Sequence, residues 1–165
     1  ALWESERAYL TSRLAAAGRP IEDFDAYIHR VSAQPESRPE GGAERAYDEM
    51  MAAACVRAAA LRHAGTLSRV YTPQGGFHVQ RGKDLRRITR LIGTGGYLSR
   101  TENAAILLEA CAPGQADADS QPLLPVSPAA YADEGYLFPL LANLAGDYPD
   151  AAARTAVGGL RVLKG

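Results

Sequence analysis

Four consecutive residues, Gly93-Thr94-Gly95-Gly96, have the types and spacing of a turn that holds a nucleotide. They follow the apolar segment 88–92, which predicts a short strand, and they precede a polar stretch that can begin a helix. Glycine has no side chain, so a ligand can approach its backbone, and amides at a helix start can face an anion or a ring edge. A tight turn that needs positive φ explains the same residues without a ligand. For this motif alone, both interpretations stay open.

The two common nucleotide motifs do not fit these residues. A P-loop ends in Gly-Lys-Ser or Gly-Lys-Thr, and here Tyr97 and Leu98 stand where the Lys and Ser would be. The dinucleotide fingerprint needs a small residue where this sequence has Leu98. It also needs an acid at the end of a second strand about 20 residues further on, and no such acid is found. What remains is a strand, a Gly-x-Gly-Gly turn and a helix.

Positive charge is concentrated beside this turn. Nine Arg and Lys residues and one acid, Asp84, lie between Arg57 and Arg100, although the whole chain has a net charge of −1. A positive field beside a glycine turn suits a ligand that carries phosphate, while a solvated basic face is the simpler alternative. Three aromatic residues interleaved with the bases are also typical of single-strand nucleic-acid binders, although strand packing explains them more simply: Tyr71, Phe77 and Tyr97.

The elements that must position the turn follow from apolar periodicity and from Gly and Pro punctuation. Segment 43–64 has apolar or small residues on nearly all sides and predicts a helix buried between layers. Segment 32–42 holds two prolines and two glycines and predicts a mobile linker. Further helices are expected at 2–17, 21–31, from Ser99 or Thr101 to Glu109, 136–145 and 147–156, and strands at 68–72, 77–80, 88–92 and 123–126.

Few other residues have the pattern of a reactive site. Cys55 lies in the apolar helix and is expected to pack there, and the three histidines lack metal-ligand spacing, so no metal site is predicted. Asp133 and Glu134 fit a catalytic carboxylate pair, but capping of the following helix is the simpler hypothesis. We therefore predict no catalytic residue. We also expect no membrane span and no signal peptide, which favours the cytoplasm.

The order of a long helix of small residues, strands, and then a strand, a glycine turn and a helix resembles the second lobe of the actin, sugar kinase and Hsp70 superfamily. In that superfamily the Gly-Gly turn after an apolar strand is the adenosine motif. Three motifs over roughly residues 40–165 further resemble the C-terminal part of the MutL family linked to glutamate mutase, which is distinct from the mismatch-repair protein of the same name. They are Arg62-His63-Ala64-Gly65, Gln80-Arg81-Gly82-Lys83-Asp84-Leu85 and Leu91-Ile92-Gly93-Thr94-Gly95-Gly96.

This resemblance implies an α/β fold, the second lobe of an actin-like and Hsp70-like (ribonuclease H-like) ATPase with extra N-terminal helices. Residues 1–42 would be a helical segment and linker, and residues 43–165 the nucleotide-binding lobe. The site would be Gly93, Thr94, Gly95 and Gly96 on the adenosine side of ATP or ADP, with Arg62, His63, Lys83 and Asp84 as further contacts from the family motifs.

The resemblance further implies an accessory or reactivating chaperone for an adenosylcobalamin-dependent mutase. Its partners would be the mutase subunits and an N-terminal ATPase lobe, which would hold most of the Mg²⁺ ligands, so we expect no ATP hydrolysis by this chain alone. The alternative is a non-catalytic module that docks on the mutase. Neither a membrane nor a nucleic acid is expected as a partner.

Overall fold

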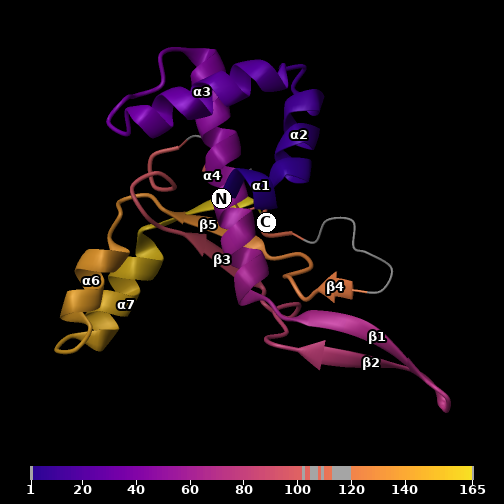
Figure 1. The fold of residues 1–165 in the computed structure, drawn as a ribbon. Coiled ribbons are helices and arrows are strands. Elements are labelled where there is room, and N and C mark those ends of the chain that lie inside the picture. The colour runs from indigo at the N-terminus through magenta and orange to yellow at the C-terminus, as the bar shows by residue number, and fades with distance from the viewer. Residues whose placement is uncertain (1, 102, 105–107, 109, 113–119, 165) are drawn as a thin grey trace. The chain divides into compact units, whose positions relative to one another are not determined.

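The computed structural model describes residues 2–101, 103–104, 108, 110–112 and 120–164. It has a mixed α/β fold with two three-stranded sheets in this part of the chain (Figure 1). The chain forms two compact units, Ala1–Ala59 and Ala60–Gly165, which meet within one long helix. The sequence predicts its domain boundary some residues earlier, at the start of the same helix.

The first unit consists of helices α1 (Leu2–Ser5), α2 (Arg7–Ala16), α3 (Ile21–Ala33) and the first part of α4 (Gly42–His63). The prediction of a single helix over 2–17 is wrong, because the helix is interrupted at Glu6, between α1 and α2. The buried carboxylate of Glu6 lies 3.3 Å from the Arg57 guanidinium. The core of this unit combines aliphatic and aromatic side chains, and contains Leu10, Leu14, Phe24, Tyr27, Tyr47, Met50 and Ala54.

Three aromatic rings hold α3 against α4 in this core. The ring of Tyr47 lies edge-on to Phe24, with centroids 5.4 Å apart, and its centroid is 5.5 Å from that of Tyr27. The Tyr27 hydroxyl donates a hydrogen bond to the carboxylate of Asp48. The predicted packing role of Cys55 on the same helix is wrong, because Cys55 is exposed. A period that places small residues on every side of a helix cannot say which side meets the core.

In the second unit, the first sheet has the strand order β2-β1-β4, with neighbouring strands antiparallel. Strands β1 (Thr66–Thr72) and β2 (Gly75–Arg81) form the predicted hairpin, closed by two residues, Pro73 and Gln74. Strand β4 (Ser120–Pro122) pairs with the first three residues of β1. The strand predicted over 123–126 is therefore wrong, because the strand ends before it, at Pro122.

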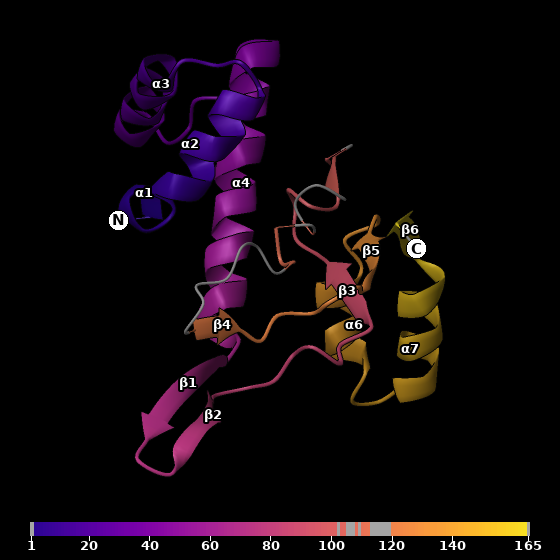
Figure 2. The ribbon, with the colours of Figure 1, turned by 90° about the vertical axis from the view of Figure 1, so that its right-hand side faces the viewer.

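The second sheet has the order β3-β5-β6 and carries the glycine turn. Strand β3 (Arg90–Gly93) is parallel to β5 (Ala129–Asp133), and β5 is antiparallel to β6 (Leu160–Lys164). Figure 2 shows these three strands side by side. Sequence reasoning predicted β3 within two residues and missed both β5 and β6.

Helices α6 (Phe138–Leu144) and α7 (Pro149–Gly158) follow β5 and lie side by side (Figures 1 and 2). Both were predicted, and Pro139 lies in the first turn of α6, where its missing amide costs nothing. The helix predicted from Ser99 or Thr101 through Glu109 falls partly outside the described residues. Within the described part of the chain, no helix combines the length and apolar character that a membrane crossing needs.

Candidate functional site

The parallel pairing of β3 with β5 brings two loops together at the carboxyl ends of both strands. Gly93 lies opposite Ala132 in the register, so Thr94, which directly follows β3, comes next to Asp133, the last residue of β5. In open α/β sheets, ligands bind outside the carboxyl ends of such strands. The predicted glycine turn therefore begins at the edge of the sheet where a ligand is expected.

The three glycines of this turn differ in their surroundings and in their backbone conformation. A Cβ at Gly93 would lie 3.3 Å from the Leu98 side chain and 3.5 Å from that of Leu108, so a larger residue at this position would crowd the Leu98 side chain. Gly95 has φ +105°, a conformation that other residues rarely adopt. A Cβ at Gly96 would meet nothing within 4 Å, and its φ is not positive. The fold therefore explains two glycines and leaves the third open.

Asp133, at the end of β5, holds the turn and a helix start with one carboxylate. It is 1% exposed. Its Oδ2 accepts hydrogen bonds from the Thr94 hydroxyl at 2.9 Å and the Phe138 amide at 3.0 Å, and its Oδ1 accepts one from the Leu137 amide at 2.8 Å. Burial alone would raise the pKa of Asp133, but these hydrogen bonds lower it below its ordinary value. Asp133 is thus an anion at neutral pH.

The two carboxylates considered as a catalytic pair have separate structural roles. Asp133 caps the start of α6, as the simpler hypothesis proposed. Glu134 is exposed and pairs with the Arg161 guanidinium of β6 at 3.0 Å. Between β5 and α6, Tyr136 has a positive φ of 51° and donates its amide to the Asp133 carbonyl at 3.0 Å. This tight turn points the chain into α6.

After the glycines, the chain makes consecutive turns in which the Ser99 amide donates to the Gly95 carbonyl at 2.9 Å and the Thr101 amide to the Tyr97 carbonyl at 3.0 Å. The Ser99 hydroxyl is buried and has no hydrogen-bond partner in the described structure. A buried hydroxyl without a partner costs stability, so a ligand or water is the expected partner. The sequence indicates Ser99 only as a possible helix cap, because nothing in the sequence shows that its hydroxyl is buried without a hydrogen-bond partner.

The remaining family-motif residues lie in two segments, Arg62 and His63 at the end of α4 and Lys83 and Asp84 after β2. Arg62, His63, Lys83 and Asp84 are exposed. The Gly65 amide donates to the Lys83 carbonyl at 2.7 Å. The contacts in this region therefore give these motifs a structural role where the two segments meet, and nucleotide contacts by these four side chains stay a prediction.

The Asp84 carboxylate organises the turn that follows this contact. It lies 2.7 Å from the Arg86 guanidinium and accepts the Arg86 backbone amide at 3.1 Å. The hydrogen bonds from the Arg86 side chain and amide lower the pKa of Asp84 to about 2. Asp84 thus shapes a turn by a local side-chain-to-backbone bond, as aspartates often do.

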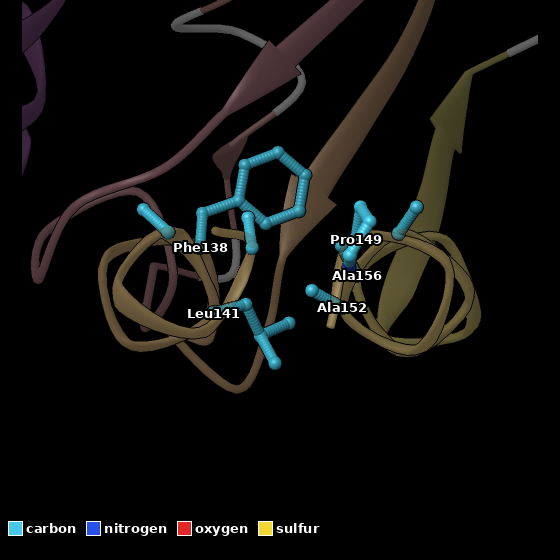
Figure 3. A pocket seen from close by; sticks show the side chains of 8 residues that line it. Phe138, Leu141, Pro149, Ala152 and Ala156 are labelled. Atoms are coloured by element: carbon cyan, nitrogen blue, oxygen red, sulfur yellow. The ribbon is translucent and has the colours of Figure 1, made fainter. Parts of the chain in front are cut away.

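An apolar groove of about 230 Å³ lies between α6 and α7 (Figure 3). Its lining has no titratable or nucleophilic side chain, so it offers neither acid–base chemistry nor phosphate binding. The groove is lined by Phe138, Leu141, Ala142, Ala145, Pro149, Ala152, Ala153 and Ala156.

Among the residues that the structure describes, no group of three or more His, Cys, Asp or Glu residues could hold a metal ion.

Comparison with known proteins gives two matches. A family model described as MutL protein matches residues 5–158. Protein MutL of Clostridium tetanomorphum is 39% identical over 117 residues, which cover 70% of this chain and 25% of that relative. The match thus spans about a quarter of the relative's length. No solved structure matches the chain significantly.

Proposed function

Because this chain belongs to the MutL protein family, we propose that it is the adenine-nucleotide-binding lobe of an ATP-dependent accessory protein. In this proposal the glycine turn 93–96 lies against the adenosine part of ATP or ADP. The complete protein acts as a reactivating chaperone for an adenosylcobalamin-dependent mutase of the glutamate mutase type. The fold that belongs to this proposal is that of the second lobe of an actin-like ATPase.

The observation that carries this proposal is the open space at Gly96. Packing explains Gly93 and backbone conformation explains Gly95, but neither explains Gly96. The absence of a side chain there leaves room for a ligand beside the carboxyl ends of β3 and β5. The buried Ser99 hydroxyl, three residues further on, adds a hydrogen-bonding group that has no partner among the described residues.

Nucleotide hydrolysis is assigned to the complete protein. The match covers a quarter of the relative's length, and we place the phosphate loop and most of the Mg²⁺ ligands in the rest of the protein. Bound Mg²⁺ would neutralise phosphate charge there, while the residues of this chain bind and orient the adenosine part. The chain alone is then expected to bind nucleotide weakly.

The test is calorimetry with the full-length protein and ADP. Gly96→Ala should weaken ADP binding at least tenfold and leave the melting temperature unchanged, because the added methyl group has space in the fold. Gly146→Ala is the matched control, since a Cβ there also meets nothing within 4 Å. No binding of ADP or ATP by the wild-type protein would overturn the proposal.

A second candidate function is a docking module that does not use nucleotide. The apolar groove between α6 and α7 favours it, because an open apolar surface suits a protein partner. Pull-down of purified mutase subunits, with and without ATP, separates the two functions. Equal capture in both conditions supports the docking module, whereas capture that depends on ATP supports the nucleotide-binding lobe.

A further inference from the structure

We propose that Asp133 is a positioning residue for nucleotide binding, which acts through Thr94 to hold the glycine turn in its binding conformation. This inference rests on the proposed function, since it concerns the same turn. It assigns a role in ligand binding to a residue that lies 39 positions away in the sequence and outside the glycine motif.

The first step of the argument is the burial of a charge. The Asp133 side chain is among the largest fully buried ones. Within the described residues it makes no ion pair with Lys, Arg or His. A buried carboxylate is costly unless hydrogen bonds stabilise it. Its three donors are therefore held firmly, because losing any of them would leave part of a buried charge unsatisfied.

The second step is the difference between the three donors. The Leu137 and Phe138 amides belong to the start of α6, whereas the third donor is the side chain of Thr94, within the glycine turn. Thr94 is exposed, so its hydroxyl could otherwise bond to water. Its bond to Asp133 ties an exposed turn to a buried anion.

The third step concerns the freedom of the turn itself. Packing fixes Gly93 at its start, but Gly95 and Gly96 have no Cβ and so have wide conformational freedom. The hydrogen bond of Thr94, which directly precedes Gly95, reduces that freedom before the ligand arrives. Binding then costs less ordering of the turn, which is the general effect of preorganisation.

The experiment measures AMP, ADP and ATP binding to the full-length protein by calorimetry. Thr94→Val removes the hydroxyl at nearly constant shape. It should weaken the binding of all three nucleotides about tenfold, because in the proposal the turn faces the adenosine part that they share. Thr94→Ser keeps the hydroxyl and should stay within about threefold of wild type. Thr155→Val makes the same change on exposed helix α7 and should leave binding unchanged.

Each outcome has a definite meaning. If the wild-type protein binds nucleotide and Thr94→Val binds it with the same affinity, the positioning role alone is overturned. Absence of nucleotide binding in the wild-type protein overturns this inference together with the proposed function. Rescue by Thr94→Ser supports positioning, since a purely steric role would not follow the hydroxyl. Should Thr94→Val not fold, Thr94→Ala is measured by the same criteria.

Discussion

Gly65 and Gly82 cross backbone to backbone, and a Cβ on Gly82 would lie 2.9 Å from the Cα of Gly65. The crossing is closed by hydrogen bonds on both sides of Gly65. Its amide donates to the Lys83 carbonyl at 2.7 Å, and its carbonyl accepts from the Leu123 amide at 2.8 Å. The motifs around residues 62–65 and 80–85 therefore meet at this point, which links the end of α4 to the first sheet.

Replacing Gly65 by Ala should destabilise the protein strongly. The new Cβ would lie 2.3 Å from the Arg81 carbonyl oxygen, which is backbone and cannot turn aside. We expect a loss of about 3 kcal/mol in the free energy of unfolding, the upper range for overpacking. Urea denaturation measures it. Gly158→Ala is the control, because a Cβ there meets nothing within 4 Å, and an equal loss in both variants would contradict the prediction.

Replacing Ser99 by Ala should leave the unliganded protein as stable as wild type or more stable by roughly 1 kcal/mol, because removing an unpartnered buried hydroxyl removes its desolvation cost. Thermal unfolding without nucleotide tests this, with the exposed Ser127→Ala as control. A clear drop in melting temperature would mean that the hydroxyl has a stabilising partner in the unliganded protein.

Replacing Tyr27 by Phe should cost about 1 kcal/mol at neutral pH, because Asp48 loses a hydrogen bond in a partly buried place. The exposed Tyr148→Phe is the matched control. Chemical denaturation of both variants at pH 7 makes the comparison. Equal stability of Tyr27→Phe and wild type would show that the bond to Asp48 contributes nothing.

The ionisation of Tyr27 should make the free energy of unfolding fall at alkaline pH. Burial, followed by the hydrogen bond to Asp48 and the nearby acids, raises the pKa of Tyr27 above its ordinary value. A raised folded pKa stabilises the protein fully below the unfolded value of about 10, and this contribution is lost as the pH rises beyond it. Unfolding followed from pH 8 to 11 should therefore show a steeper decline above pH 10 in wild type than in Tyr27→Phe.

Replacing Arg86 by Gln should return the pKa of Asp84 from about 2 toward its ordinary value near 4. The Arg86 side chain supplies two of the hydrogen bonds to this carboxylate, at 2.9 and 2.7 Å. Because the folded pKa is lowered, the stabilisation is present above the unfolded pKa and is lost as the pH falls toward 2. Carboxyl NMR titration measures this pKa, and an unchanged value in Arg86→Gln would contradict the role of the pair.

Much of the fold could be predicted because its signals are local. The family prediction is confirmed, and the long helix α4, the hairpin and both C-terminal helices follow from periodicity and from Gly and Pro positions. Strand β5 could not be predicted in this way. Its residues, Ala129-Ala130-Tyr131-Ala132-Asp133, are mostly small and have low β-propensity, and they form a strand through pairing with β3 and β6.

The candidate site was predictable only on one of its two loops. The glycine turn carries its own signal, whereas its link to Asp133 depends on the parallel pairing of β3 with an unpredicted strand. The sequence did indicate that Asp133 caps the next helix, because an acid before a helix start is a local pattern. No local pattern indicates that its second oxygen also accepts from Thr94.

The shared carboxylate of Asp133 restricts how this site can be altered in evolution or by design. A substitution there releases the Thr94 hydroxyl and uncaps α6 at the same time. No single second substitution replaces both functions, because the two sets of donors belong to different segments of the chain. Under the proposed function, variation in nucleotide affinity is therefore expected to arise at Thr94, where one change affects the turn alone, and Asp133 should tolerate little substitution.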